Sequence, residues 1–125
     1  MKIRIQANSI RLRLSQSEVQ AFAETGRVEE RIQFGTGPGE SLVYIVERAA
    51  GRQLSAAYAV GQIIVFVPAD ACSEWAATDQ VGIESEMDLG DGGTLRILVE
   101  KDFKCLTERA GEDESDNFPN PNLSC

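Results

Sequence analysis

Apolar and polar side chains alternate at the start of the chain, and a related pattern returns near its middle. Residues 3–7 and 10–14 place an apolar side chain at every second position, which is typical of half-buried β-strands. The short polar stretch between them favours a tight turn. Residues 56–60 and 63–67 follow the same plan around a second short turn. The pattern therefore predicts two β-hairpins.

A short helix is predicted after each hairpin. Ser15 and Glu18 have the spacing of a capping box, in which the serine oxygen and the glutamate carboxylate accept hydrogen bonds from the first amides of a helix. Phe22 then falls on the apolar side of that helix. In the second half Pro68 stands at the helix start, where its missing amide costs little, and Trp75 takes the place of Phe22.

Two more strands, joined by a glycine-rich turn, complete each half. The spacing of apolar residues places them near residues 28–34 and 42–46 in the first half, and near residues 81–87 and 95–99 in the second. The interior positions predicted for the earlier strand of each pair are Val28, Ile32 and Phe34, and then Val81, Ile83 and Met87. Each half therefore has the predicted order β-β-α-β-β.

The two halves match each other without a gap. Residues 1–48 align with residues 54–101 at a constant offset of 53, with nine identical positions. A match at a fixed offset usually marks a duplicated supersecondary unit. One copy cannot bury both its sheet face and its helix stripe, whereas two copies can cover each other. We therefore predict a single domain over residues 1–125, made of two repeats and a C-terminal segment at residues 102–125.

The fold class that follows from this organisation is α+β. The internally duplicated β-β-α-β-β units are expected to form a mainly antiparallel barrel or two packed sheets, with two short helices and an irregular acidic C-terminal segment. With 125 residues, the chain is long enough for one compact core and too short for two ordinary domains. The order of the elements also resembles that of the swapped-hairpin and double-psi barrels of the AbrB-like proteins.

Composition excludes several classes of function. The chain has no histidine, which removes the usual general base and the commonest zinc ligand, and three cysteines without a signal sequence argue against a disulfide framework. The alternating first residues form neither a secretion signal nor a membrane span, so we expect a cytoplasmic protein with no membrane partner. The net charge of −8 argues against nucleic-acid binding, which needs an excess of lysine and arginine on the contact face.

The outward positions of the two predicted hairpins differ in chemistry. Arg4, Arg11 and Arg13 give the first hairpin a basic face, whereas the matching face of the second carries Ile64 and Phe66. The arginines could hold one anion or the acidic tail of the same chain, although a hydrated outer face is the simpler interpretation. The apolar pair predicts an interface with the tail, a second copy or another protein. The alternative is that both side chains lie beneath the two helices.

The C-terminal segment contains a second candidate site. Cys105, Glu112, Asp113 and Asp116 combine thiol and carboxylate groups, which could form a metal or catalytic site against the arginine face. The spacing of these residues matches no standard zinc or calcium pattern. We therefore assign no metal, no cofactor and no catalytic residue from the sequence.

Motifs near both ends of the chain are distinctive. The chain begins MKIRI, continues with SIRLRL at residues 9–14, and carries GEDESDNFPNP at residues 111–121. These motifs resemble those of a family of small uncharacterised bacterial proteins, and the resemblance covers essentially the whole chain. It implies a single-domain bacterial protein and supplies no catalytic residues.

Two classes of function follow from the sequence. We favour a non-catalytic binding or protein-interaction module that forms a homodimer or binds another protein, because no catalytic constellation is visible. The alternative is a small metal-binding protein or enzyme whose site is formed by the cysteine and acidic residues of the C-terminal segment. Whether the chain is an enzyme is therefore left open at this stage.

Overall fold

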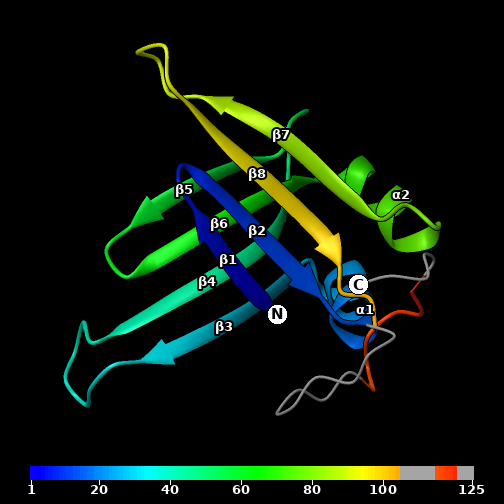
Figure 1. Ribbon diagram of the computed structural model, residues 1–125, viewed down its shortest axis with the longest axis horizontal. Coiled ribbons are helices and arrows are strands. Elements are labelled where there is room, and N and C mark those ends of the chain that lie inside the picture. Colours follow the sequence, from blue (N-terminus) through cyan, green and yellow to red (C-terminus); the bar gives the residue numbers. More distant parts are fainter. Residues whose placement is uncertain (105–114, 121–125) are drawn as a thin grey trace.

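The computed structural model of the protein describes residues 1–104 and 115–120. Its elements are β1 (Lys2–Gln6), β2 (Ser9–Leu14), α1 (Gln16–Thr25), β3 (Arg27–Gln33), β4 (Ser41–Ala49), β5 (Ser55–Ala59), β6 (Gln62–Pro68), α2 (Ala69–Ala77), β7 (Gly82–Asp88) and β8 (Thr94–Lys101). Sheet A has the strand order β1-β2-β8-β7, and sheet B has the order β3-β4-β6-β5. Figure 1 shows the two helices together at one end of the sheets. The predicted α+β class is confirmed.

The two sheets pack against each other without closing into a barrel. Strands β5 and β7 lie at neighbouring edges, but the described contacts between these edges run through side chains. The Ser85 hydroxyl donates to the Leu54 carbonyl oxygen at 2.7 Å, and the Ala56 amide lies 3.5 Å from the Met87 sulfur. A side-chain contact cannot continue a backbone ladder. Of the two arrangements predicted, packed sheets are therefore confirmed and the barrel is wrong.

Each sheet contains one hairpin from each half of the chain. In sheet A the hairpin β1–β2 joins β7–β8 through a parallel pairing of β2 with β8, and in sheet B the hairpin β5–β6 joins β3–β4 through a parallel pairing of β6 with β4. Ile10 lies opposite Ile97 in sheet A, and Ile63 lies opposite Tyr44 in sheet B, which is the same register at the offset of 53. Because the hairpins are exchanged in this way, neither half holds a complete sheet.

The core lies between the sheets and extends to the helices. Phe22 of α1 and Trp75 of α2 are fully buried, and their rings meet edge to face with centroids 6.4 Å apart. Cys72 is buried in the same core, where burial raises the pKa of its thiol. The inner faces of the two sheets supply Leu12, Leu14, Ile97 and Val99, and Tyr44, Val46, Val65 and Val67. The two large aromatic side chains therefore share one interior.

The third strand of each half departs from the constant offset. Val28 and Ile83 occupy equivalent places in the two sheets, so the structural offset here is two residues greater than in the other strands. The turn after β7 is two residues shorter than the turn after β3, which restores the offset before the fourth strand. As a result, the interior positions predicted at Phe34 and Val81 are wrong. These side chains lie outside the strands and are 73% and 45% exposed.

Both helices end against a basic side chain from the last strand of the same half. Arg48 donates to the carbonyl oxygen of Ala23 at 3.1 Å, and Lys101 donates to that of Thr78 at 2.7 Å. Neither helix has a basic residue in its own last turn. The two long side chains therefore complement the negative ends of the helix dipoles. This contact gives the buried Lys101 a structural role.

Candidate functional site

The outer face of sheet A carries the three arginines that the sequence predicted there. Arg4 of β1 lies directly opposite Arg11 of β2, and Arg13 is the next outward residue of β2. Glu100 of β8 places its Oε1 2.7 Å from Arg13 Nε and 3.6 Å from Arg11 Nε. Arg4 instead donates to the side-chain oxygen of Gln6 at 3.2 Å. We call Arg4, Arg11 and Arg13 the arginine face.

The outer face of sheet B is apolar at the corresponding positions. Ile64 and Phe66 of β6 are half-buried there beside the buried Val43 and Ile45 of β4, and none of the four belongs to the core cluster between the sheets. The alternative that Ile64 and Phe66 lie beneath the helices is therefore wrong. Sequence analysis missed Val43 and Ile45, although the unbroken apolar run over residues 42–46 is typical of a strand buried on both faces. We call these four residues the apolar face.

The charged residues beside the apolar face balance each other. Arg27 contacts Glu47 at 2.7 Å and Glu29 at 3.2 Å. Arg31, the second arginine on this side of the sheet, donates to the Ser41 hydroxyl at 3.1 Å. The outer side of sheet B therefore carries two arginines and two glutamates. This side is close to neutral, although the chain has a net charge of −8.

The described part of the C-terminal segment is attached to the start of α1. The Asp116 carboxylate accepts hydrogen bonds from the Ser17 hydroxyl at 2.5 Å and from the Ser17 amide at 3.4 Å, and its carbonyl oxygen accepts from the Gln16 amide at 3.0 Å. The hydrogen bond from Ser17 lowers the pKa of the Asp116 carboxyl. Phe118 packs against Phe103, with ring centroids 5.8 Å apart. These contacts satisfy amides that have no partner within the helix.

The predicted C-terminal site is only partly described. Asp116 lies at the start of α1, and none of its described contacts reaches the arginine face, which pairs with Glu100. Cys105, Glu112 and Asp113 lie outside the described residues. Among residues 1–104 and 115–120, no group of three or more histidine, cysteine, aspartate or glutamate side chains is placed to hold a metal ion. The thiol and carboxylate site therefore stays a prediction.

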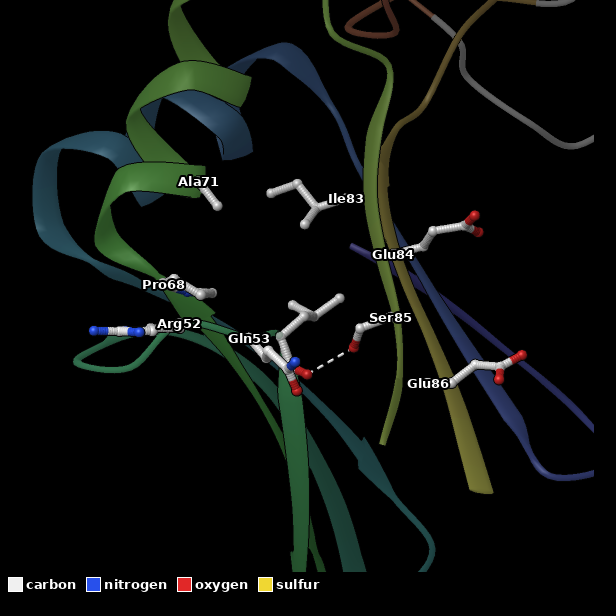
Figure 2. Close-up of a pocket in the computed structure, with 9 residues that line it drawn as sticks. Arg52, Gln53, Pro68, Ala71, Ile83, Glu84, Ser85 and Glu86 are labelled. Carbon is white, nitrogen blue, oxygen red and sulfur yellow. Dashed lines mark hydrogen bonds between the residues drawn. The ribbon is translucent and has the colours of Figure 1, made fainter. Parts of the chain in front are cut away.

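A cavity of about 310 Å³ opens between α2 and β7 (Figure 2). Figure 2 shows Ala71 and Pro68 facing Ile83 across this cavity, and polar residues such as Gln53 and Ser85 complete its lining. Ser85 lines the cavity near β5, where its hydroxyl is already bonded to the Leu54 carbonyl oxygen. This hydroxyl therefore already has an acceptor for its proton.

The charged groups at the rim of the cavity do not converge. Figure 2 shows the carboxylates of Glu84 and Glu86 directed away from the cavity, while Arg52 extends from its opposite side. A general acid or base must lie within hydrogen-bond reach of the proton that it transfers to or from a bound substrate. The arrangement of these three side chains does not support a catalytic role for the cavity.

The equivalent place in the first half of the chain is filled by an ion-pair cluster. There the buried Met1 ammonium group contacts the carboxylate of Glu18 and lies 3.0 Å from that of Glu30. Ala71 and Ser85 take the places of these two glutamates in the second half, and their small side chains leave the cavity open. The cavity is thus explained by a difference between the halves.

The ion-pair cluster perturbs the charges of its members. Burial by itself would lower the pKa of the Met1 amine, but hydrogen bonds and charges from Glu18 and Glu30 outweigh it and raise that pKa. For Glu18, burial would raise the carboxyl pKa, but the hydrogen bonds from the Met1 amine and the Ser15 amide lower it. Both groups are therefore held in their charged forms. The cluster fixes Met1, the residue before β1, against α1 and β3.

Comparison with known proteins places the chain without assigning it an activity. The model of a family of unknown function, DUF7009, matches residues 1–122. No curated protein and no solved structure matches the chain. Within the described residues, neither helix is long and apolar enough to cross a membrane. The arginine face of sheet A and the apolar face of sheet B are the features of the described residues that point to a function.

Proposed function

The chain belongs to DUF7009, a family of unknown function, and from its outer faces we propose that it is a non-catalytic interaction module that forms a homodimer. The single observation that carries this proposal is the apolar face of sheet B. Its four residues lie on the far side of the sheet from the core, where a soluble domain usually presents polar side chains. Val43 and Ile45 are already buried, so the accessible apolar surface comes from the half-buried Ile64 and Phe66. Burial of this surface against a partner would favour association.

The neighbouring strand supports a sheet-to-sheet contact. Strand β5 contributes Ala57 and Ala59 to the same side of sheet B, and both side chains are exposed. Alanine side chains are short, so another sheet can approach them closely. Two sheets that pack face to face lie about 10 Å apart with their side chains interleaved. The large Ile64 and Phe66 beside the small alanines provide the uneven surface that such packing needs.

Charge balance favours a second copy as the partner. Each chain has a net charge of −8, so two copies repel each other through most of their surfaces. The outer side of sheet B is an exception, because its two arginines and two glutamates cancel. A two-fold axis through this face would bring identical apolar patches together and would allow Arg31 to meet a glutamate of the second copy. We therefore propose sheet B as the dimer interface.

Mass measurements on matched variants test the proposed dimer. We expect sedimentation velocity to show a monomer–dimer equilibrium in the micromolar range, which fits a contact smaller than a standard protein interface. Phe66→Lys places a charge on the apolar face and should shift the protein to monomer, with at least a tenfold weaker association. Tyr58→Lys is the control, because Tyr58 is 75% exposed and lies on the other side of the same hairpin.

The control variant makes the outcome specific to one side of the sheet. Circular dichroism must first show that both lysine variants keep the native β content. If Tyr58→Lys dissociates the dimer and Phe66→Lys does not, the interface lies elsewhere and the proposal is wrong. A protein that stays monomeric up to several hundred micromolar also rejects it.

Other parts of the functional picture stay predictions. They include an origin by duplication of the repeats at residues 1–48 and 54–101, a bacterial source, a cytoplasmic location and the absence of a nucleic-acid partner. The distribution of charge supports the last of these, because the half with the arginine face has seven basic and six acidic residues and the rest of the chain is acidic.

A further inference from the structure

We propose that the arginine face of sheet A binds the phosphate group of a small phosphate monoester. This site lies on the opposite sheet from the proposed dimer interface, so the two proposals are independent. The inference rests on the cross-strand placement of the arginines, on the local excess of positive charge, and on two surface depressions that meet at Arg11.

Two of the three arginines lie side by side on neighbouring strands. Arg4 and Arg11 are direct neighbours across the β1–β2 ladder, and like charges in such a pair repel each other. The fold does not require basic residues at these positions. The corresponding positions of the second hairpin hold Ala57 and Ile64, on strands with the same register. A ligand that bridges the two guanidinium groups would remove the repulsion.

The described carboxylates neutralise only part of this charge. Glu100 is the acidic residue in contact with Arg11 and Arg13, and its side chain is 16% exposed. Arg4 makes its described contact with the uncharged Gln6. Three arginines and one glutamate leave an excess of two positive charges. A phosphate monoester carries about −1.5 to −2 at neutral pH, whereas a simple carboxylate carries −1, so the phosphate matches this excess better.

Two shallow depressions provide space for the ligand. One, of about 170 Å³, is lined by side chains that include Arg4, Arg11 and Arg13. The other has a similar volume of about 170 Å³ and is lined by Arg11 together with Ser9 and Arg96. Arg11 therefore borders both. A phosphate held between Arg4 and Arg11 can extend its ester group over the polar Ser9 side of the face.

The net negative charge of the protein favours a small phosphate monoester over a nucleic acid or a membrane lipid as the ligand. Outside this face the protein is strongly acidic, with a net charge of −8 over the whole chain. A nucleic acid or an anionic bilayer would bring many negative charges close to that acidic surface and would be repelled. A small molecule with a single phosphate group contacts only the arginine face. The proposed ligand is therefore a small phosphate monoester.

Inorganic phosphate is the probe for this site. We expect saturable binding with a dissociation constant of about 1 mM in a calorimetric titration, as for a few charged hydrogen bonds at a solvated site. Shifts of the arginine side-chain resonances in nitrogen-15 spectra would locate the bound ion. Arg11→Gln should weaken binding about tenfold or more. Arg52→Gln changes the net charge equally at an exposed position between β4 and β5, outside both proposed surfaces, and is the matched control.

The outcomes distinguish phosphate binding at the arginine face from a general effect of net charge. Weaker binding in Arg11→Gln with unchanged binding in Arg52→Gln supports the site, and so does weaker binding of acetate than of phosphate. Equal losses in both variants, or no saturable binding, would overturn the proposal. Phosphatidylcholine vesicles that contain phosphatidic acid form the second arm of the test. Sedimentation with these vesicles in the absence of binding to free phosphate would overturn it as well.

Discussion

At the scale of single residues, charged groups that are partly removed from water join elements of the first half of the chain. The Met1 ammonium group lies between the carboxylates of Glu18 and Glu30. The Glu18 carboxylate also accepts a hydrogen bond from the Ser15 amide at 3.0 Å. Tyr44 adds a hydrogen bond from its hydroxyl to the Met1 carbonyl oxygen at 3.0 Å. Glu18 therefore joins the capping box of α1 to the start of β1.

Substitution of Glu18 should weaken this connection. We expect Glu18→Gln to lower the free energy of unfolding by about 2 kcal/mol at neutral pH, because it removes a carboxylate that accepts charge-assisted hydrogen bonds. Glu24→Gln is the control, since Glu24 lies on the same helix and accepts only from Gln20 among its described contacts. Urea unfolding of the three proteins measures the difference.

The pH dependence of this difference follows from the two pKa shifts. The pKa of the Met1 amine is raised in the folded state, so its stabilisation is complete below its ordinary pKa of about 8 and is lost as the pH rises through the folded-state pKa. The pKa of Glu18 is lowered, so its stabilisation is complete above about 4.5 and is lost as the pH falls through the folded-state pKa. Wild type and Glu18→Gln should therefore converge at both extremes. A difference that stays constant both as the pH rises above about 8 and as it falls below about 4.5 would contradict the proposed ion pairing.

At the scale of elements, both helices receive a basic side chain at their C-terminal ends, but they differ in what holds their N-terminal ends. Helix α1 begins with the capping box and receives Asp116 from the C-terminal segment. Helix α2 begins after Pro68 and has no side-chain hydrogen bond at its N-cap. The described C-terminal residues therefore stabilise one helix of the pair. This contact gives Asp116 a structural role in addition to any role in binding.

Removal of the Asp116 side chain should loosen the first turn of α1. We expect Asp116→Ala to increase hydrogen exchange at the Ser17 amide, because this amide loses its carboxylate acceptor. Exchange at Phe22, in the buried middle of the helix, should change little. Asp116→Asn keeps one acceptor oxygen and is the matched variant with a smaller effect. Equal exchange at Ser17 in all three proteins would show that the segment does not cap the helix in solution.

At the scale of the whole molecule, the exchange of hairpins between sheets makes the two halves depend on each other. Sheet A and sheet B each need strands from both halves, and Phe22 and Trp75 meet between them. Neither half can expose its inner face without breaking a parallel strand pairing. The protein should therefore unfold as one unit.

A double-mutant cycle tests this dependence. We expect Phe22→Leu and Trp75→Phe each to cost about 1–2 kcal/mol of unfolding free energy. Because the rings contact each other edge to face, the double variant should differ from the sum by about 1 kcal/mol. Tryptophan fluorescence and circular dichroism should report one coincident transition in the wild type. Two separate transitions would show that the halves fold independently, and additive costs would show that the two rings do not stabilise each other.

The sequence by itself determined the elements and the faces. The period of two at the start of the chain and the residues around Ser15 predicted the first hairpin and helix, and the offset of 53 indicated that Phe22 and Trp75 are equivalent. The outward positions of the arginine face were also correctly placed. Local alternation suffices for these features because strand geometry alone fixes which side chains share a face.

Only the tertiary structure decided the pairing and register of the strands. The longer connection before β7 and the shorter turn after it cancel in length, so the shift that moved Val81 out of the interior leaves no gap in the sequence match. Closure into a barrel or packing as sheets depends on edge contacts between distant residues, such as Ser85 with Leu54. The position of Asp116 at α1 depends on a contact across nearly the whole chain. Long-range contacts of this kind have no local period that a sequence pattern could reveal.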